Sequence, residues 1–391
     1  MKIMFMKWES FGNPYIIKEF TNAGYEIIEY DFPQKTKNVR ANEELSGDIV
    51  KKILENGVSL VFSFNYFPVI AMAAKACRRK YFCWVYDSPA ILLYSKTIFF
   101  DTNYIFHFDH TQVVEFQNAG VEHIYYLPMA AAVQEYDELV VKEQDRLQYH
   151  ADVAMIGSMY DEERYQIFKR FDGFDDYTKG YLDAVVNAQA ELYGTSILEE
   201  ALQPDIMQRI AEVFRITTHV DGWERPEWVI ANYYLAKKAT AKARRELMEL
   251  LSREFDVALY TPEATAHLTR VRNMGCVDYY KEAPLAMKCA KININNTLRS
   301  IPSGIPLRAM DIMGCGGFLL TNYQADFSEL FQPGEDFVYY ESAKDAVQLV
   351  HYYLQHEEER KHIAETGYQK VKQFHTFRQR VQTMLSVVLE G

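Results

Sequence analysis

The sequence predicts an α/β fold built from two doubly wound parallel sheets. Short apolar runs alternate with helical patterns from the first residue, and the same alternation returns in the last third of the chain, after a long helical stretch. A length of 391 residues is enough for two or three domains. Hydrophobic residues make up 49% and charged residues 25% of the chain, which is typical of an ordinary folded protein.

The first domain is predicted to contain six strands that are apolar enough to be buried on both faces. They are expected at residues 2–7, 26–30, 60–64, 81–86, 104–108 and 123–127. Crossover helices are expected between these strands, at residues 14–23, 42–56, 68–80 and 111–119. This order of elements is that of a doubly wound sheet, in which ligands bind at the carboxyl ends of the strands.

A polar, acidic stretch at residues 134–150 predicts the boundary of the first domain. We expect one domain at 1–148 and a second at 149–375, with a carboxyl-terminal helix at 376–391 that packs back onto the first. The second domain is expected to carry a helical insertion at about 161–252. Its strands are predicted at residues 151–158, 257–260, 292–295, 318–321 and 338–340. Two such sheets that face each other form a cleft, so functional residues are expected at the strand exits.

Charge and composition argue against several classes of function. The 42 lysines and arginines against 54 aspartates and glutamates give a net charge of −12, which repels nucleic acids and anionic membranes. We expect no signal peptide and no integral membrane segment, because no apolar run approaches about 18 residues. Five scattered cysteines fit a reducing compartment and argue against a disulfide scaffold or a zinc site. The sequence therefore predicts a cytoplasmic protein without a nucleic-acid partner.

The most informative segment is 291–311, where a predicted strand leads through a loop of Ser, Gly and Pro into a helix. Pro306 suits the first turn of that helix, whose free N–H groups, with Arg299 and Arg308 nearby, form a reasonable seat for a diphosphate. The expected ligand contacts in the loop are Ser303, Gly304, Ile305, Pro306 and Leu307. Asp311 lies on the same face as Arg308, where its carboxylate can accept both hydroxyls of a ribose. A capped helix in which Arg308 and Asp311 only pair with each other explains the spacing about equally well.

A second loop of small residues follows the first strand of the second domain. Gly157 permits close approach of the backbone and Ser158 offers a hydroxyl, whereas Arg164 is more typical of a surface ion pair. The candidates for contact with a nucleobase are Tyr260, Val277 and Tyr279. A core position is the default for any single tyrosine.

Strand exits in the first domain also carry polar side chains. These side chains are Ser63, Asn65, Asp87, Ser88, His107, Asp109 and His110. Asp87 ends a strand at the rim of the expected cleft. His107 and His110 lack a third partner at helical spacing and make a poor metal site, so a base or a structural pair is favoured there.

Several common catalytic motifs are absent from the sequence. It contains no GxxxxGK[ST] phosphate loop, no GxSxG elbow and no HExxH motif, and no GxGxxG follows the first strand. The glycines within residues 314–317 stand between a helix and a strand, where they predict a helix C-cap. P-loop kinases, hydrolases and dehydrogenases therefore lose support.

As a set, the motifs of the second domain resemble the carboxyl-terminal domain of CgeB-like bacterial glycosyltransferases. That group includes spore-maturation proteins and belongs to the wider retaining GT-B enzymes. The resemblance is carried by residues 303–311, 316–323, 340–342 and 375–376, with Arg380. The first domain is similar to the amino-terminal domain often fused to it, at residues 63–65, 84–89, 94–95 and 126–128.

The resemblance implies a GT-B fold, in which two Rossmann-like domains face a cleft. It also implies a nucleotide-sugar donor on the second domain, with a UDP-sugar as the leading candidate, and no obligatory metal. In the wider retaining group, two acidic residues eight positions apart bracket the donor loop, and the second binds the ribose. Asp311 matches the second position, but Ser303 stands at the first, which leaves donor orientation to backbone amides and the serine hydroxyl.

We therefore expect a retaining glycosyltransferase with a protein or glycan acceptor. Arg299, Arg308 and the amides around Gly304 would stabilise the leaving diphosphate. The expected acceptor contacts are Ser63, Asn65 and Ser88, with Asp87 as first candidate for the acceptor hydroxyl and His107 and Asp109 behind it. The alternatives are a nucleotide-sugar epimerase of the same fold and a catalytically silent carbohydrate-binding or spore-surface protein, which Ser303 favours.

Overall fold

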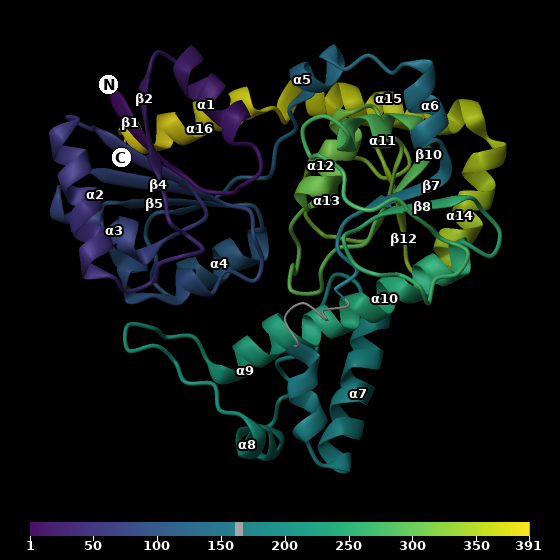
Figure 1. Ribbon diagram of the computed structural model, residues 1–391, viewed down its shortest axis with the longest axis horizontal. Helices are drawn as coiled ribbons and strands as arrows, with labels where there is room; N and C mark the ends of the chain where they lie inside the picture. Colours follow the sequence, from purple (N-terminus) through teal and green to yellow (C-terminus); the bar gives the residue numbers. More distant parts are fainter. Residues whose placement is uncertain (161–166, 391) are drawn as a thin grey trace. The chain divides into compact units, whose positions relative to one another are not determined.

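The computed structural model describes residues 1–160 and 167–390, and the chain divides into two compact units. Unit 1 comprises Met1–Ala130, Thr218–Glu224 and His375–Gly391, and unit 2 comprises Ala131–Thr217 and Arg225–Phe374. Each unit holds one six-stranded sheet in which every strand pairing is parallel (Figure 1). The predicted class, two α/β domains with parallel sheets, is confirmed.

The sheet of unit 1 has the strand order β2-β1-β3-β4-β5-β6. Its strands are β1 (Lys2–Lys7), β2 (Glu26–Asp31), β3 (Leu60–Phe64), β4 (Lys80–Val85), β5 (Asn103–His107) and β6 (Ile124–Tyr126). Every residue of β3 and β5 is buried, because helices cover both faces of the sheet. Because these strands are continuous apolar runs, their positions could be predicted from the sequence.

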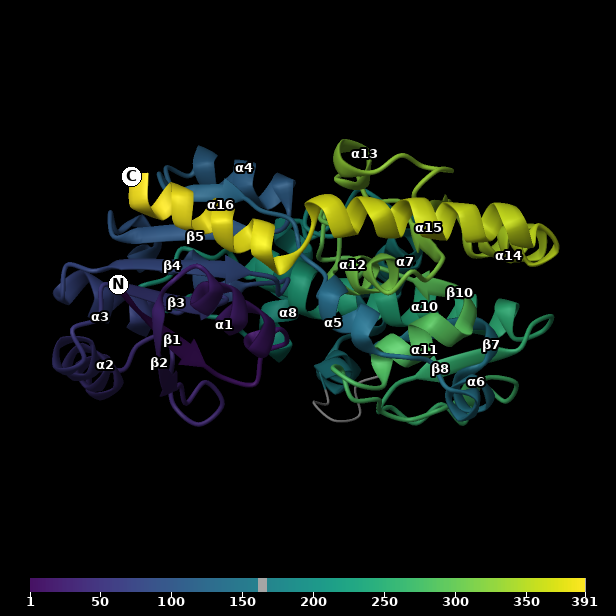
Figure 2. The ribbon, with the colours of Figure 1, turned by 90° about the horizontal axis from the view of Figure 1, so that it is seen from above.

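Helices cover the two faces of this sheet separately. Helices α1 (Asn13–Asn22) and α16 (Phe377–Glu390) lie on one face, and α2 (Glu43–Glu55), α3 (Pro68–Ala76) and α4 (His110–Asn118) lie on the other (Figures 1 and 2). Phe377 begins α16, and its ring lies 5.4 Å from Tyr15 and 5.8 Å from Trp84. Between β4 and β5 the chain forms only two short 3-10 turns, η1 (Ile91–Tyr94) and η2 (Lys96–Phe99).

The sheet of unit 2 has the order β12-β11-β10-β7-β8-β9. Its strands are β7 (Ala151–Ile156), β8 (Val257–Tyr260), β9 (Arg272–Asn273), β10 (Ala290–Asn295), β11 (Leu319–Asn322) and β12 (Val338–Tyr340). Its covering helices are α6 (Glu143–Tyr149), α10 (Ala236–Leu251), α11 (Ala283–Cys289), α12 (Leu307–Gly314), α13 (Phe327–Leu330), α14 (Ala343–Gln355) and α15 (Glu357–Phe374). Strand β9 is too short to give a pattern in the sequence.

The polar stretch that predicted the domain boundary belongs to unit 2. It forms α5 (Val133–Glu138) and α6, and the unit begins already at Ala131. The ammonium of Lys288 donates to the carbonyls of Tyr136 (2.5 Å) and Leu139 (3.2 Å), and Lys372 pairs with Asp137 at 3.0 Å. These polar contacts attach the stretch to unit 2. The spacing of apolar residues gives no sign of such contacts, so the sequence placed the domain boundary too late.

The predicted insertion is a helical subdomain with a core of its own. Helices α7 (Asp176–Glu191), α8 (Pro204–Val213) and α9 (Pro226–Val229) lead into a π-helical turn at Ile230–Leu235 and then into α10. Their core includes Phe171, Phe174, Leu182, Leu198, Ile206 and Ile230. Arg164 lies outside the described residues.

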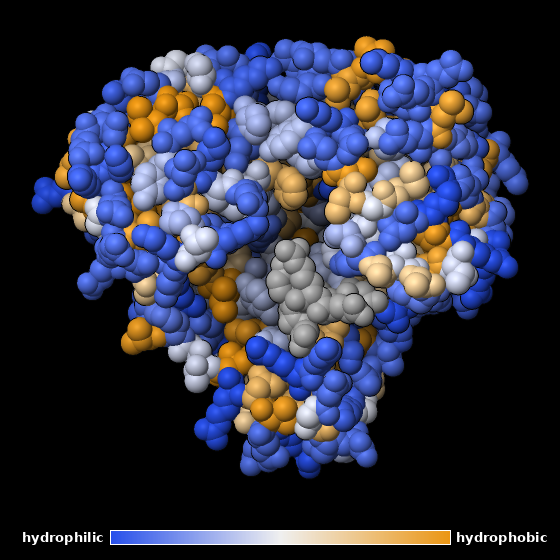
Figure 3. Space-filling model, viewed as in Figure 1, coloured by the Kyte–Doolittle hydropathy of each residue, from blue (hydrophilic) through white to orange (hydrophobic). Residues whose placement is uncertain are grey.

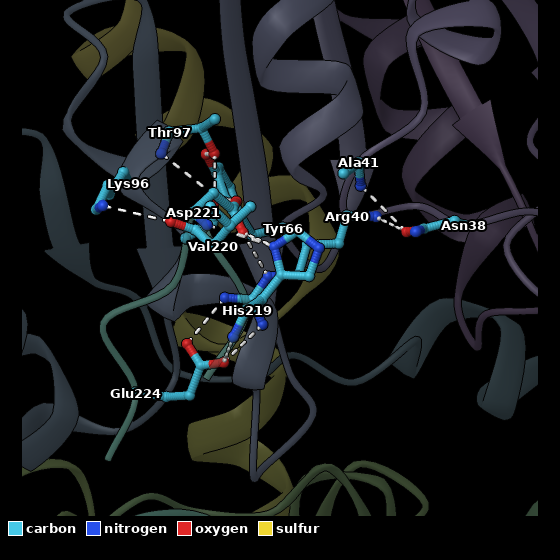
Figure 4. Close-up of polar contacts among 11 residues, drawn as sticks. Asn38, Arg40, Ala41, Tyr66, Lys96, Thr97, His219, Val220, Asp221 and Glu224 are labelled. Atoms are coloured by element: carbon cyan, nitrogen blue, oxygen red, sulfur yellow. Dashed lines mark hydrogen bonds and ion pairs between the residues drawn. The ribbon is translucent and has the colours of Figure 1, made fainter. Parts of the chain in front are cut away.

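One segment of this insertion, residues 218–224, packs in unit 1, and we call it the arm (Figure 4). It contains a turn at residues 220–221 and a β-bridge between Gly222 and Ser95, where the sequence predicted part of a helical insertion. Trp223 of the arm packs on Tyr94, with ring centroids 4.6 Å apart. The arm therefore lies against the face of unit 1 where the β4–β5 connection has no full helix.

No helix in the described part of the chain is both long and apolar enough to cross a membrane. Hydrophilic residues cover most of the face shown in Figure 3, in keeping with the 25% of charged residues.

Candidate active site

Three loops at the carboxyl edge of the sheet of unit 2 form what we call the exit site, residues 157–160, 261–263 and 296–308. They follow β7, β8 and β10, which are neighbouring parallel strands and therefore end at the same edge. The sequence predicted two of these loops, after β7 and after β10. The loop after β8 was not predicted to take part.

Arg244, which the sequence analysis missed, joins two of the loops from α10. Its Nε donates to the carbonyl of Asn296 at 3.1 Å, and its Nη1 and Nη2 donate to the carbonyls of Ser158 and Asn296. The guanidinium lies 4.9 Å from the ring centroid of Tyr160, and a Cβ on Gly157 would lie 3.5 Å from Nη1. Arg244 is buried and has no carboxylate partner among the described residues, so backbone carbonyls alone hold its positive charge.

Glu263, in the loop after β8, reaches the loop after β7. Its carboxylate accepts from Ser158 Oγ (2.5 Å), from the N–H of Met159 (2.6 Å) and from Thr261 Oγ1. It also accepts from the N–H of Tyr160 (3.1 Å), which donates to Ser158 Oγ as well (2.9 Å). Four donors therefore converge on one carboxylate, as they do at sites that bind anions through successive backbone N–H groups.

Arg299 is a structural residue, which corrects its predicted role as a phosphate ligand. Its guanidinium donates to the carbonyls of Ala190 (2.9 Å) and Thr297 (3.0 Å) and lies 4.3 Å from the ring centroid of Tyr193. It is buried, which lowers the pKa of the guanidinium below its usual value. Unpaired carbonyls at the end of α7 attract such a cation, so Arg299 fastens that helix to the loop after β10.

The loop from Ser303 to Leu307 is held rigidly. Gln324 Nε2 donates to the carbonyl of Gly304 at 3.1 Å, and the N–H of Asp326 donates to the carbonyl of Ser303, also at 3.1 Å. Ile305 is fully buried, and Pro306 is the N-cap of α12, whose first residue is Leu307. The helix starts where the sequence predicted, which directs its first N–H groups towards the loop.

The carboxylate of Asp311 is covered by side chains of unit 2. Its Oδ1 accepts from Tyr136 Oη (2.8 Å) and Tyr279 Oη (3.1 Å), and its Oδ2 lies 3.4 Å from Arg308 Nη1. Burial raises the pKa of the carboxyl to about 6. The structure thus shows the pairing of Arg308 with Asp311, and the predicted ribose hydroxyls would meet a carboxylate already occupied by two tyrosines. Arg308 itself keeps 24% of its side chain exposed.

The two other residues predicted to contact a base, Tyr260 and Val277, differ in their burial. Tyr260 is buried and packs 6.3 Å from Tyr149, and its hydroxyl has no hydrogen-bond partner among the described residues. It is therefore a core tyrosine, which corrects its predicted role. Val277 packs against the same apolar cluster and is only half-buried.

In unit 1, Asp87 lies exposed just beyond the end of β4. Asn65 orients it: Asn65 Nδ2 donates to Asp87 Oδ2 at 2.6 Å, and Asn65 Oδ1 accepts from the N–H of Tyr86 at 3.1 Å. Asn65 has a left-handed backbone (φ 55°), which asparagine tolerates better than most residues. Ser88 Oγ accepts from Gln112 at 3.4 Å. The structure therefore brings Asn65 and Asp87 together, as neighbours at one strand edge.

His107, Asp109 and Ser63 are fully buried, and this corrects their predicted contact with an acceptor. The N–H of Asp109 donates to His107 Nδ1 at 3.1 Å, and burial lowers the pKa of the imidazole to about 4. The side chain of Asp109 caps α4 by accepting from the N–H of Gln112 at 3.0 Å. Ser63 Oγ lies 2.6 Å from both the carbonyl of Asn65 and the hydroxyl of Tyr81. The hydrogen bonds of these three residues stabilise the loops that follow β3 and β5.

Comparison with known families gives a match over part of the chain. Residues 239–386 match the model of a family described as glycosyl transferase-like. This span includes Arg244, Glu263, Arg308 and Asp311. No curated protein matches the chain.

Comparison with solved structures identifies the fold. The chain is similar to HepE from Anabaena in complex with UDP and glucose, with a TM-score of 0.61, 11% identity and 100% of both chains covered. It is similar to a glycosyltransferase from Rickettsia africae (TM-score 0.56, 11% identity, 100% of this chain and 98% of that one). It is also similar to sucrose-phosphate synthase from Thermosynechococcus elongatus (TM-score 0.54, 11% identity, 100% and 98%). The two-sheet architecture is that of GT-B proteins.

Proposed function

We propose that this GT-B chain is a glycosyltransferase of the CgeB-like group that takes its sugar from a nucleoside diphosphate donor bound at the exit site. The observation that carries the proposal is Arg244, a buried guanidinium without a carboxylate partner among the described residues, placed between the ends of β7 and β10. A buried unneutralised cation at a strand exit favours an anionic ligand. The family match over residues 239–386 supports the same conclusion. UDP is the leading candidate, because HepE was solved with UDP and with UDP-glucose.

Fixed positive groups would supply most of the catalysis. When the bond between the anomeric carbon and the diphosphate oxygen breaks, negative charge develops on the departing phosphate. Arg244, the partly exposed Arg308 and the first N–H groups of α12 are fixed before the reaction and so stabilise that charge without reorganising. These groups account for departure of the diphosphate without a metal, so excess EDTA should leave turnover unchanged.

The acceptor, a protein or a glycan, would be recognised by unit 1. Asp87 is the exposed carboxylate there, and Asn65 fixes its orientation. We assign Asp87 to contact with the acceptor hydroxyl, and propose retention of configuration at the sugar. Asp87→Asn should then weaken the use of acceptor while the release of UDP by slow donor hydrolysis continues.

Incubation of the full chain with a panel of nucleotide sugars tests the proposal. Release of nucleoside diphosphate together with transfer of the sugar is expected. Conversion of the donor sugar alone would indicate an epimerase, and binding without turnover would indicate a silent carbohydrate-binding protein, the alternative that Ser303 favours. Absence of any nucleoside diphosphate binding in a thermal-shift titration would contradict all three.

A further inference from the structure

Glu263 has no task in the proposed reaction, yet its carboxylate accepts four hydrogen bonds in the exit site. Its carboxylate accepts from two successive backbone N–H groups, of Met159 and Tyr160, and from the hydroxyls of Ser158 and Thr261. It has no lysine, arginine or histidine partner among the described residues, as the ion pairs of the chain show. The charge of Glu263 is therefore balanced by the loop after β7.

That loop has the chemistry of an anion site. Tyr160 has a left-handed backbone (φ 55°), and the N–H groups of Met159 and Tyr160 both donate to the carboxylate of Glu263. Arg244 lies beneath it, bonded to the carbonyl of Ser158 and stacked on the ring of Tyr160. A phosphate accepts hydrogen bonds through several anionic oxygens, so the donors that hold Glu263 would hold a phosphate equally well.

We propose that Glu263 occupies the seat of a donor phosphate and thereby sets the affinity of the exit site for nucleoside diphosphates. This inference rests on the proposed function. A donor phosphate binds only when the Glu263 carboxylate leaves the N–H groups of Met159 and Tyr160, so the free protein holds its own substitute anion. The carboxylate and the phosphate compete for the same donors and repel each other.

A second contact in unit 2 has the same character. The hydroxyls of Tyr136 and Tyr279 both donate to Asp311 Oδ1, at 2.8 and 3.1 Å. Asp311 is the carboxylate for which the sequence predicted ribose hydroxyls. In both places a side chain of the chain itself supplies the group that a nucleotide would bring.

Removal of the Glu263 charge tests the inference directly. Glu263→Gln should bind inorganic pyrophosphate and UDP at least about tenfold more tightly than the unaltered chain in calorimetric titrations, because a competing charge is gone. Glu249→Gln is the matched control: it makes the same change of charge at an exposed position of α10, and should leave both affinities unchanged. Equal or weaker binding by Glu263→Gln, with a melting temperature close to that of the control, would overturn the inference.

A measurement on the unaltered chain covers the case in which Glu263→Gln does not fold. The sequence contains one Met-Tyr pair, Met159-Tyr160, so labelling methionine carbonyls with ¹³C and tyrosine nitrogens with ¹⁵N isolates the N–H signal of Tyr160. Pyrophosphate should shift that signal in proportion to binding. Calorimetric binding without a shift would overturn the inference while leaving the proposed function intact. A shift together with failure to bind any nucleotide would instead contradict the proposed function.

Discussion

At the scale of single residues, Arg299 and Arg308 show how two arginines in one loop take different roles. Arg299 donates to the carbonyls that end α7 and is buried, whereas Arg308 keeps a quarter of its side chain exposed beside Asp311. Sequence spacing predicted a phosphate role for both. The difference arises from contacts with residues more than one hundred positions away, which spacing within the loop does not reveal.

This difference predicts opposite effects of two alanine substitutions. Arg308→Ala should lower kcat about 100-fold, as removal of a charge-stabilising donor commonly does, and lower the free energy of unfolding by only about 1 kcal/mol. Arg299→Ala should lower the free energy of unfolding by about 3 kcal/mol, because three buried carbonyls lose their donor. Denaturant titrations and steady-state kinetics on both variants measure the two effects. An equal loss of stability in the two variants would contradict these roles.

The buried carboxyl of Asp311 predicts a dependence of stability on pH. Its pKa is about 6 in the folded chain, above the usual 3.8 of an exposed aspartate, so folding favours the protonated form. The stabilisation is fully present below pH 3.8 and is lost as the pH rises through 6, by up to about 3 kcal/mol.

Asp311→Asn removes this titration. The difference in free energy of unfolding between Asp311→Asn and the unaltered chain should move in favour of the variant between pH 4.5 and 7.5, by about 2 kcal/mol. Asp205→Asn, an exposed change in α8, serves as the control. A difference that stays constant with pH would show that Asp311 is not buried as described.

At the scale of elements, the strands were predictable and the connections between them were not. β3 and β5 are buried on both faces and therefore read as continuous apolar runs. The start of α12 was predictable because proline fits a first helical turn. Arg244 and Glu263 were missed because the partners that join them to other loops lie 52 to 105 positions away, and no local pattern records such a pairing.

The arm, residues 218–224, was missed for a related reason. Its residues fall within the predicted helical insertion, whereas its partner in the structure is Arg40 of unit 1. Arg40 donates from Nη1 to Glu224 Oε1 (3.0 Å) and from Nη2 to Glu224 Oε2 (2.8 Å), and from Nε to Asp221 at 3.0 Å (Figure 4). The side chains of Arg40 and Glu224 are 12% and 4% exposed, so the pair is largely shielded from water.

Breaking this pair on one side should be more damaging than removing both charges. Arg40→Met leaves Glu224 buried without its cation and should lower the free energy of unfolding by about 3 kcal/mol. Arg40→Met combined with Glu224→Gln should recover at least about half of that loss, because the buried Glu224 charge is then gone and the more exposed Asp221 keeps Ser95 as a donor. Chemical denaturation of the single and double variants measures the coupling. Additive losses would show that the arm is held by its aromatic contacts instead.

At the scale of the whole molecule, the chain passes between the two units four times, at 130–131, 217–218, 224–225 and 374–375. The first and the last of these crossings follow from the predicted domain order, in which a carboxyl-terminal helix returns to the first domain. The other two belong to the arm. Arg380, buried in α16, donates to the carbonyls of Pro128 (2.7 Å) and Met129 (3.1 Å). Within unit 1, these bonds join the segment before the first crossing to the helix after the last one.

The proposed function and the proposed role of Glu263 both depend on the position of one diphosphate. A crystal structure of the full chain soaked with UDP tests it most directly. We predict phosphate density at the ends of β7 and β10, bonded to the N–H groups of Met159 and Tyr160, with the Glu263 side chain turned away. UDP bound elsewhere on the chain, with Glu263 still seated on those N–H groups, would contradict the account.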